Sequence, residues 1–298
     1  MLFKTRRLVI STTLILVIAT MTITTVRADG TLVRGFDVPA TTPESPHSVR
    51  PSIYWPIGVT FDGSNLYYSQ PCQCTEGIFH TTTTGVLINT LREVSQVGAL
   101  AWDGTHLWAG SFPTNGSTCT SGIIGCAYIT EIDPSTGNVI MTIDLSSIFA
   151  QDQECGFIDG LSYDSSSGTL WVSPDIGCLC SIVPNCDAIG FVYEVNMAGN
   201  LVQRIQESFG VAGVSKVGNS LYMVAEGYIP HGRAIVKTTL TGTVISNFAT
   251  VSVSGNRESA ESIAFDPTTF APNCALWAVQ DYGFPFDASL AAYQIACP

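Results

Sequence analysis

Five carboxylic acids occupy corresponding places beside short apolar segments of this 298-residue chain, and they are the residues best suited to do chemistry. Asp159 and Glu261 directly precede such segments, and Asp175, Glu226 and Asp281 directly follow others. Carboxylates that converge on one place repel one another, so a cation or raised pKa values would be needed there. Their hard oxygen atoms suit Ca²⁺ or another divalent cation such as Mg²⁺. The alternative is that each acid hydrogen-bonds loop amides, caps a strand end and faces solvent.

A base for proton transfer is harder to find, because the chain has only four histidines. His231 and Arg233 follow Glu226 closely and are expected to reach the same place. Glu226 and His231 are therefore the candidates for a catalytic base, and Asp175 and Arg233 are candidates for ligand binding. A lone loop histidine is otherwise a solvated side chain. The chain lacks the Gly-x-Ser-x-Gly, His-Glu-x-x-His and phosphate-binding Gly-Lys-Ser/Thr motifs.

Aromatic side chains offer a second kind of chemistry. Tyr282 and Phe284, in the stretch Tyr282–Phe286, could stack on a sugar or an apolar ligand, or could plug the end of the fold. Other aromatic residues recur at repeat positions, and we expect them to pack in the core rather than to form a sugar platform. These recurring residues include Phe61, Trp102, Tyr163 and Phe265.

The elements that must position these residues form a unit that recurs five times. Its marker is a Leu-aromatic step, and successive markers are 41, 63, 51 and 55 residues apart. The markers are Leu66-Tyr67, Leu107-Trp108, Leu170-Trp171, Leu221-Tyr222 and Leu276-Trp277. An aromatic-Asp step and a short turn precede four of them, whereas the fourth unit has Lys216-Val217 instead. Repeats of this period with short strands and tight turns predict a β-propeller.

The two ends of the chain predict how the ring closes. The fifth unit stops before its last turn and strand, and the missing piece recurs as Asp29-Gly30-Thr31-Leu32-Val33. We therefore predict an all-β fold, a propeller of five blades of four antiparallel strands, with residues 31–38 pairing with the last blade. Blade repeats are expected to begin near residues 56, 97, 159, 211 and 261, within one domain at 29–298.

Loop lengths predict that one face carries the function. Turns between the first and second strands are short, whereas the second-to-third loops at 69–77, 112–126, 174–189 and 227–233 are long. Seven of the ten cysteines fall in these long loops. We predict a Cys274–Cys297 disulfide on the opposite face and a Cys119–Cys126 disulfide within one loop. The remaining pairs cannot be deduced from spacing.

The N-terminal 28 residues have the pattern of an export signal. A basic start is followed by an apolar stretch, Leu8–Val26, and by a small-x-small step ending at Ala28. The alternative is an uncleaved anchor, since the apolar stretch approaches the roughly 20 residues that span a bilayer. With an even number of cysteines, cleavage predicts a secreted, extracellular, periplasmic or cell-surface protein held by disulfides.

The net charge of the chain argues against nucleic acids and anionic membrane surfaces as partners. Removal of residues 1–28 takes away four basic residues and leaves 8 basic and 24 acidic ones, a net charge of −16. This balance opposes binding to nucleic acid or to an anionic membrane surface. We expect a monomer that binds an extracellular small molecule, glycan or protein.

The segment Gly-Val-Thr-Phe-Asp-Gly-Ser-Asn-Leu-Tyr at residues 58–67 resembles the repeats of NHL-type, YVTN-type and gluconolactonase-like propellers. In gluconolactonase-like enzymes, a Glu before a first strand and acids on other blades hold a divalent metal. The resemblance implies that role for Glu261, with Asp159 and Asp281 as further metal ligands. Those enzymes have six blades and Asn ligands that cannot be placed here. The chain is also similar in size to five-bladed secreted glutaminyl cyclases, whose motifs are not recognisable in it.

Two functions follow from these residues. The first is a secreted, disulfide-stabilised module that binds an extracellular ligand, glycan or protein. The alternative is a metal-dependent hydrolase of the lactonase or esterase kind, in which the cation polarises a carbonyl and lowers the pKa of bound water. The lack of a catalytic motif favours the binding module, and the converging acids favour the enzyme.

Overall fold

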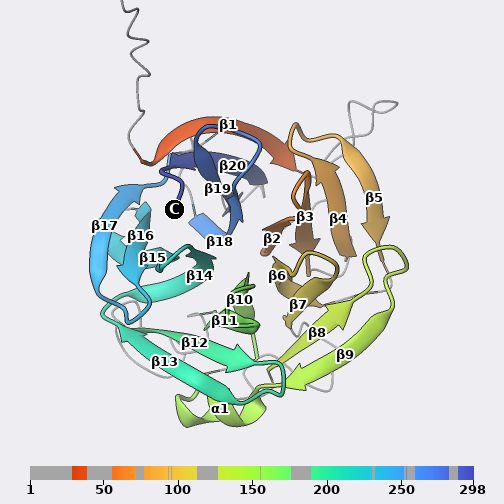
Figure 1. Cartoon of the computed structure of the whole chain (residues 1–298), viewed down its shortest axis with the longest axis vertical. Coiled ribbons are helices and arrows are strands. Elements are labelled where there is room, and N and C mark those ends of the chain that lie inside the picture. The colour runs from red at the N-terminus through yellow and green to blue at the C-terminus, as the bar shows by residue number, and fades with distance from the viewer. Residues whose placement is uncertain are drawn as a thin grey trace, which may run out of the picture.

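The protein is a five-bladed β-propeller (Figure 1). The computed structural model describes residues 29–38, 56–71, 77–92, 94, 96–112, 127–154, 156–175, 189–229, 232–251, 253, 259–281 and 288–298. Five four-stranded antiparallel sheets surround a central axis, as the repeat predicts, and each contributes its first strand to the centre.

The first three blades follow one another along the chain. Blade 1 consists of β2 (Val59–Phe61), β3 (Asn65–Gln70), β4 (Gly77–Thr82) and β5 (Leu87–Leu91). Blade 2 consists of β6 (Val97–Trp102), β7 (Leu107–Ser111), β8 (Tyr128–Ile132) and β9 (Val139–Asp144). Blade 3 consists of β10 (Ile158–Asp164), β11 (Thr169–Pro174), β12 (Gly190–Asn196) and β13 (Leu201–Glu207). The short helix α1 (Ser146–Gln151) links blades 2 and 3.

The last two blades complete the ring. Blade 4 consists of β14 (Gly210–Val217), β15 (Ser220–Ile229), β16 (Gly232–Thr239) and β17 (Val244–Ala249). Blade 5 consists of β18 (Ser259–Asp266), β19 (Cys274–Asp281), β20 (Ala288–Ile295) and the N-terminal strand β1 (Thr31–Val38). In the part of the chain that the structure describes, no helix has the length and apolar character needed to cross a membrane.

Strand β1 closes the ring, which confirms the prediction from the chain ends. It runs antiparallel to β20, with Thr31 opposite Gln294 and Val38 opposite Ala288. The N–H of Ala296 donates to the Asp29 carboxylate at 2.8 Å. The Cys274–Cys297 disulfide, also as predicted, ties the C-terminus to the start of β19 with the two Cα atoms 5.0 Å apart. Closure of this kind protects the edge of β20 and holds both ends of the chain.

Neighbouring blades are held together by apolar packing. Each buried cluster draws side chains from adjoining sheets: Tyr68 of blade 1 packs in the same cluster as Trp277 of blade 5 and Val38 of β1. The fully buried side chains are large, and Trp171, Trp277 and Tyr193 are at most 1% exposed. Because apolar burial contributes roughly 25 cal/mol per Å², these inter-blade layers supply most of the stabilisation of the ring.

The inner strands touch backbone to backbone because each has a very small residue at its point of closest approach. A Cβ atom on Gly213 would lie 2.5 Å from the carbonyl oxygen of Glu261 in blade 5. Gly58 meets the backbone of Gly98, and Gly98 meets the backbone carbonyl of Ile158, in the same way. Because glycine has no side chain, it lets the strands approach this closely at these positions.

Serine hydroxyls add hydrogen bonds between the blades. Ser111 donates to the carbonyl of Gly156 at 2.7 Å, and Ser173 donates to the carbonyl of Ala212 at 2.9 Å. Ser69 likewise joins blades 1 and 2, since it donates to the carbonyl of Gly98. Buried backbone carbonyls at the blade junctions are thereby satisfied.

We expect Gly98→Ala to lower the free energy of unfolding by about 3 kcal/mol or more, because the new methyl group overlaps the backbone of the next blade. Gly104→Ala is the control: it has open space around its Cβ and a φ of +105°, so it costs only about 1 kcal/mol of backbone strain. Urea unfolding of both variants measures the difference. Equal costs would contradict backbone contact between inner strands.

Candidate functional site

A pocket of about 270 Å³ lies at one end of the central axis, on the face that carries the turns between first and second strands. Side chains and backbone from the inner strands of all five blades line it, and we call it the mouth pocket. Its lining residues are Thr60, Phe61, Asp62, Gly63, Ala101, Trp102, Leu161, Ser162, Tyr163, Ser215, Lys216, Ile263, Ala264, Phe265 and Pro267.

One repeat position supplies a side chain to this pocket from every blade. Each of these residues pairs with the leucine of its own Leu-aromatic step, so all five are equivalent in register. They are Phe61, Trp102, Tyr163, Lys216 and Phe265. Four blades therefore present an aromatic ring to the mouth pocket, and blade 4 presents the only lysine among its lining residues.

The aromatic residues of the mouth pocket pack in or against the buried clusters, as expected, and three of them are also partly accessible. Trp102, Tyr163 and Phe265 are half-buried, whereas Phe61 is 7% exposed. Trp102 also packs between blades, since its ring lies 6.1 Å from that of Tyr67 at an interplanar angle of 13°. Core packing thus holds the Trp102 ring on one side, while the half-buried aromatic residues remain partly accessible to a ligand.

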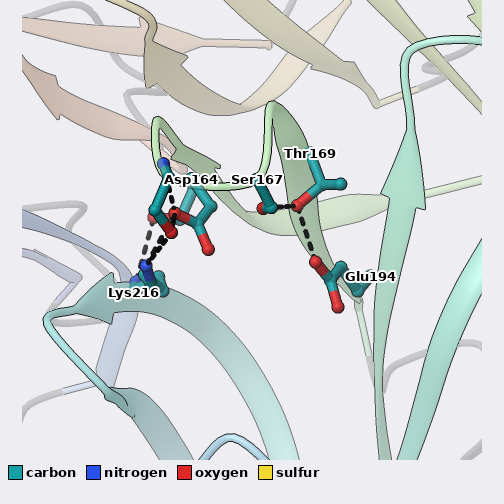
Figure 2. A network of polar contacts seen from close by, with 7 residues as sticks. Asp164, Ser167, Thr169, Glu194 and Lys216 are labelled. Carbon is teal, nitrogen blue, oxygen red and sulfur yellow. Dashed lines mark hydrogen bonds and ion pairs between the residues drawn. The ribbon is translucent and has the colours of Figure 1, made fainter.

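Lys216 is fixed by an ion pair that joins blades 3 and 4 (Figure 2). Its Nζ atom donates to Asp164 at 2.6 Å, and its backbone N–H donates to Ser162 at 3.0 Å. Burial raises the pKa of Asp164, but hydrogen bonds from Lys216 and Ser166 outweigh it and bring the pKa to about 2. Lys216, at the irregular position of the fourth repeat, thus supplies the positive charge that pairs with the Asp164 carboxylate of blade 3.

The aspartate of each aromatic-Asp step organises the turn that follows it. In blade 5, Asp266 accepts the backbone N–H groups of Thr268 and Thr269, and its second oxygen accepts the Trp277 indole N–H at 2.9 Å. In blade 3, Asp164 Oδ1 accepts the backbone N–H of Ser166 and also the Lys216 Nζ. Unlike that of Trp277, the indole nitrogen of Trp171 is buried without a hydrogen-bond partner among the described residues.

A second polar network links the turn to the third strand. In blade 3, Ser167 contacts Thr169, and Thr169 donates to Glu194 at 2.7 Å (Figure 2).

Blade 2 has a histidine at the place of Thr169. There His106 Nδ1 lies 2.9 Å from Glu131 and 3.8 Å from Asp103. Within the described chain, these three form the group whose ligand atoms, all within 4.8 Å of one another, could hold a metal ion.

The acids predicted as metal ligands lie on inner and second strands. Asp159 in β10 is 2% exposed, and Glu261 in β18 is 7% exposed. Asp281 ends β19 opposite Ser259, but its side chain lies outside the described part of the structure. The role of these three residues in metal binding therefore stays a prediction.

Of the remaining predicted residues, the structure describes Asp175 and the backbones of Glu226 and Arg233. Asp175 follows β11 and is half-buried, and its backbone N–H donates to Phe157 at 2.9 Å. The backbones of Glu226 and Arg233 belong to β15 and β16, but their side chains are outside the described part. Five further predicted residues lie outside the described residues, namely His231, Tyr282, Phe284, Cys119 and Cys126. Their roles stay predictions.

Glu154 is a buried carboxyl that sequence reasoning missed. It follows α1, is 1% exposed, and its Oε2 atom has no hydrogen-bond partner among the described residues. Burial, followed by the charges of Asp152 and Asp175, raises its pKa to about 8. A carboxyl that keeps its proton at neutral pH can donate it. No repeat pattern marks this position, so only the fold shows its burial.

Comparison with known proteins supports the fold and leaves the activity open. No family model matches the chain, and no curated protein matches its sequence. Among solved structures it is similar to Myxococcus xanthus glutaminyl cyclase, with a TM-score of 0.55 and 12% identity over 89% of this chain and 97% of that one. A tail fiber of Staphylococcus aureus phage P68 gives a TM-score of 0.53 and 14% identity over 89% of this chain and 52% of that one. At such identities the likeness shows the propeller fold alone.

The buried Glu154 should make stability depend on pH. Its pKa is about 8 in the fold against 4.5 ordinarily, so its contribution is full below pH 4.5 and is lost as the pH rises towards 8. We expect the melting temperature to fall over that window and Glu154→Gln to flatten the fall. Glu207→Gln is the comparison variant. Burial raises the pKa of Glu207 only to about 7, so its contribution to the pH dependence of stability should end near pH 7. Wild-type and Glu154→Gln curves that run parallel would contradict this account.

The Lys216–Asp164 pair should show strong coupling in a double-mutant cycle. Asp164 is buried and Lys216 is half-buried, with 6% and 12% of their side chains exposed. Lys216→Met should lower the free energy of unfolding by about 3 kcal/mol, because it leaves Asp164 buried without its cation. Adding Asp164→Asn should recover part of that loss, as measured by urea unfolding. Additive effects of the two substitutions would show that the pair does not interact.

Proposed function

We propose that the protein is an extracellular ligand-binding module whose mouth pocket takes one ring of a neutral glycan. The observation that carries the proposal is the convergence of Phe61, Trp102, Tyr163 and Phe265 from four blades on one pocket. Aromatic rings present broad apolar faces on which the C–H faces of a sugar ring stack, and this arrangement is typical of carbohydrate sites.

Polar groups of the same pocket suit the hydroxyl groups of a sugar. Ser162 and Ser215 line the pocket beside the rings. Among the described lining residues, Lys216 is the one lysine or arginine, and its charge is paired with Asp164, so these residues offer no free cation to attract an anionic ligand. Combined with the acidic balance of the whole chain, −12, this favours a neutral ligand over an anionic one.

Titration calorimetry with neutral mono- and oligosaccharides tests the proposal. We expect saturable binding of one sugar per chain and a loss of about tenfold in affinity in Trp102→Ala and Tyr163→Ala, because each removes a stacking face. Tyr128→Ala is the matched control, since Tyr128 is half-buried on β8 and does not line the pocket. Its affinity should equal that of the wild type.

Two results would contradict the proposal. One is the absence of heat with every neutral sugar tested. The other is sugar binding that both pocket variants leave unchanged, which would place the ligand elsewhere, with the long-loop face as the next surface to test. Circular dichroism of each variant separates lost binding from lost folding.

A further inference from the structure

We propose that Asp103, His106 and Glu131 form a binding site for a divalent transition-metal ion, with Zn²⁺ as the reference ion. Asp103 and His106 lie at the turn between β6 and β7, and Glu131 lies on β8 opposite Trp108. This site is separate from the mouth pocket, which none of the three residues lines. It also differs from the all-oxygen site that the sequence predicts.

The distances suit a tetrahedral ion. His106 Nδ1 lies 2.9 Å from Glu131 Oε1 and 3.8 Å from Asp103 Oδ2. Two ligands bound to zinc at 2.0–2.1 Å in a tetrahedron are about 3.3 Å apart, which falls between these distances. Small side-chain movements would therefore bring all three atoms to bonding distance and leave a fourth position for water.

The surroundings hold the Asp103 carboxylate in place. Its Oδ1 atom accepts the backbone N–H groups of Thr105 and His106, each at 2.8 Å. Its Oδ2 atom accepts the indole N–H of Trp108 at 2.9 Å. Hydrogen bonds of this kind orient a metal ligand and limit the entropy lost on binding.

Charge and access also suit a cation. The side chains of Asp103 and Glu131 are 15% and 12% exposed, whereas His106 is 35% exposed and opens the site to solvent. The ion pairs that these two acids make within the described residues are with His106 alone. When His106 is neutral, the site therefore carries two negative charges without a lysine or arginine to offset them.

The equivalent positions in blades 1 and 3 show how the arrangement in blade 2 differs. Blade 3 has Thr169 in place of His106, and Thr169 simply hydrogen-bonds Glu194 at 2.7 Å. Blade 1 has a histidine, His80, but it pairs with the single carboxylate of Asp62 at 3.2 Å. In the described blades the full set of two carboxylates and a histidine occurs in blade 2. The competing account is a plain hydrogen-bonded network like that of blade 3.

The ligand set also selects the ion. One imidazole and two carboxylates are typical zinc ligands, whereas Ca²⁺ takes six to eight oxygen atoms. We therefore expect Zn²⁺ to bind and Ca²⁺ to bind far more weakly at this site.

The test is calorimetric titration of the purified mature protein with Zn²⁺ and with Ca²⁺. His106→Gln removes the ring nitrogen but keeps an N–H donor for Glu131, and His80→Gln is the matched control in blade 1. We expect one saturable Zn²⁺ ion at this site, lost in His106→Gln and retained in His80→Gln. Trp108→Phe should weaken zinc binding by about tenfold, because it removes a hydrogen bond that orients Asp103.

Three outcomes would overturn the proposal: no zinc heat, zinc binding unchanged in His106→Gln, or equal affinity for Ca²⁺ and Zn²⁺. Cobalt supplies a second readout that does not depend on heat. Co²⁺ bound by this set should give visible absorption bands that His106→Gln abolishes and His80→Gln keeps. Far-ultraviolet circular dichroism identical to that of the wild type shows that the variants are folded.

Discussion

The close approach of five inner strands at the axis is the constraint on which the rest of the structure depends. A ring of only five blades brings these strands into backbone contact, and Gly58, Gly98, Gly160 and Gly213 make that contact sterically possible. The fifth inner strand has Ser262 at the corresponding place, fully buried. Since the strands leave no room for large side chains at this level, a ligand pocket can form only where they diverge towards an end of the axis.

The mouth pocket occupies such an end, and the repeat itself decides its chemistry. The aspartate of each aromatic-Asp step is committed to its turn, as Asp266 is, so it is not free to vary. The preceding residue lines the pocket and varies between blades, as Trp102, Tyr163 and Lys216 illustrate. Lys216 breaks the aromatic pattern but binds Asp164 of the neighbouring blade, so the irregular repeat strengthens a junction.

Sequence reasoning predicted the blades because the repeat is local: Leu-aromatic steps and turns specify each hairpin without reference to other blades. It also predicted the closing strand and the Cys274–Cys297 disulfide from the chain ends. It did not predict the mouth pocket, because the residues that meet there are separated by 41 to 63 positions and converge only when the ring closes. The burial of Glu154 was not predicted for the same reason, since it comes from tertiary packing. The sequence predicted a metal site from acids beside strands. The proposed zinc site instead includes His106 and Glu131, which meet only through the pairing of β7 with β8.

Fluorine NMR of protein labelled with 5-fluorotryptophan tests most directly whether the mouth pocket is the ligand site. Among the tryptophans in the described residues, Trp102 is the one that lines the pocket, whereas Trp108, Trp171 and Trp277 are at most 3% exposed. With the Trp102 signal assigned from Trp102→Phe, our account predicts that a bound sugar shifts that signal most. A binding sugar that leaves the Trp102 signal in place and shifts another would contradict the account.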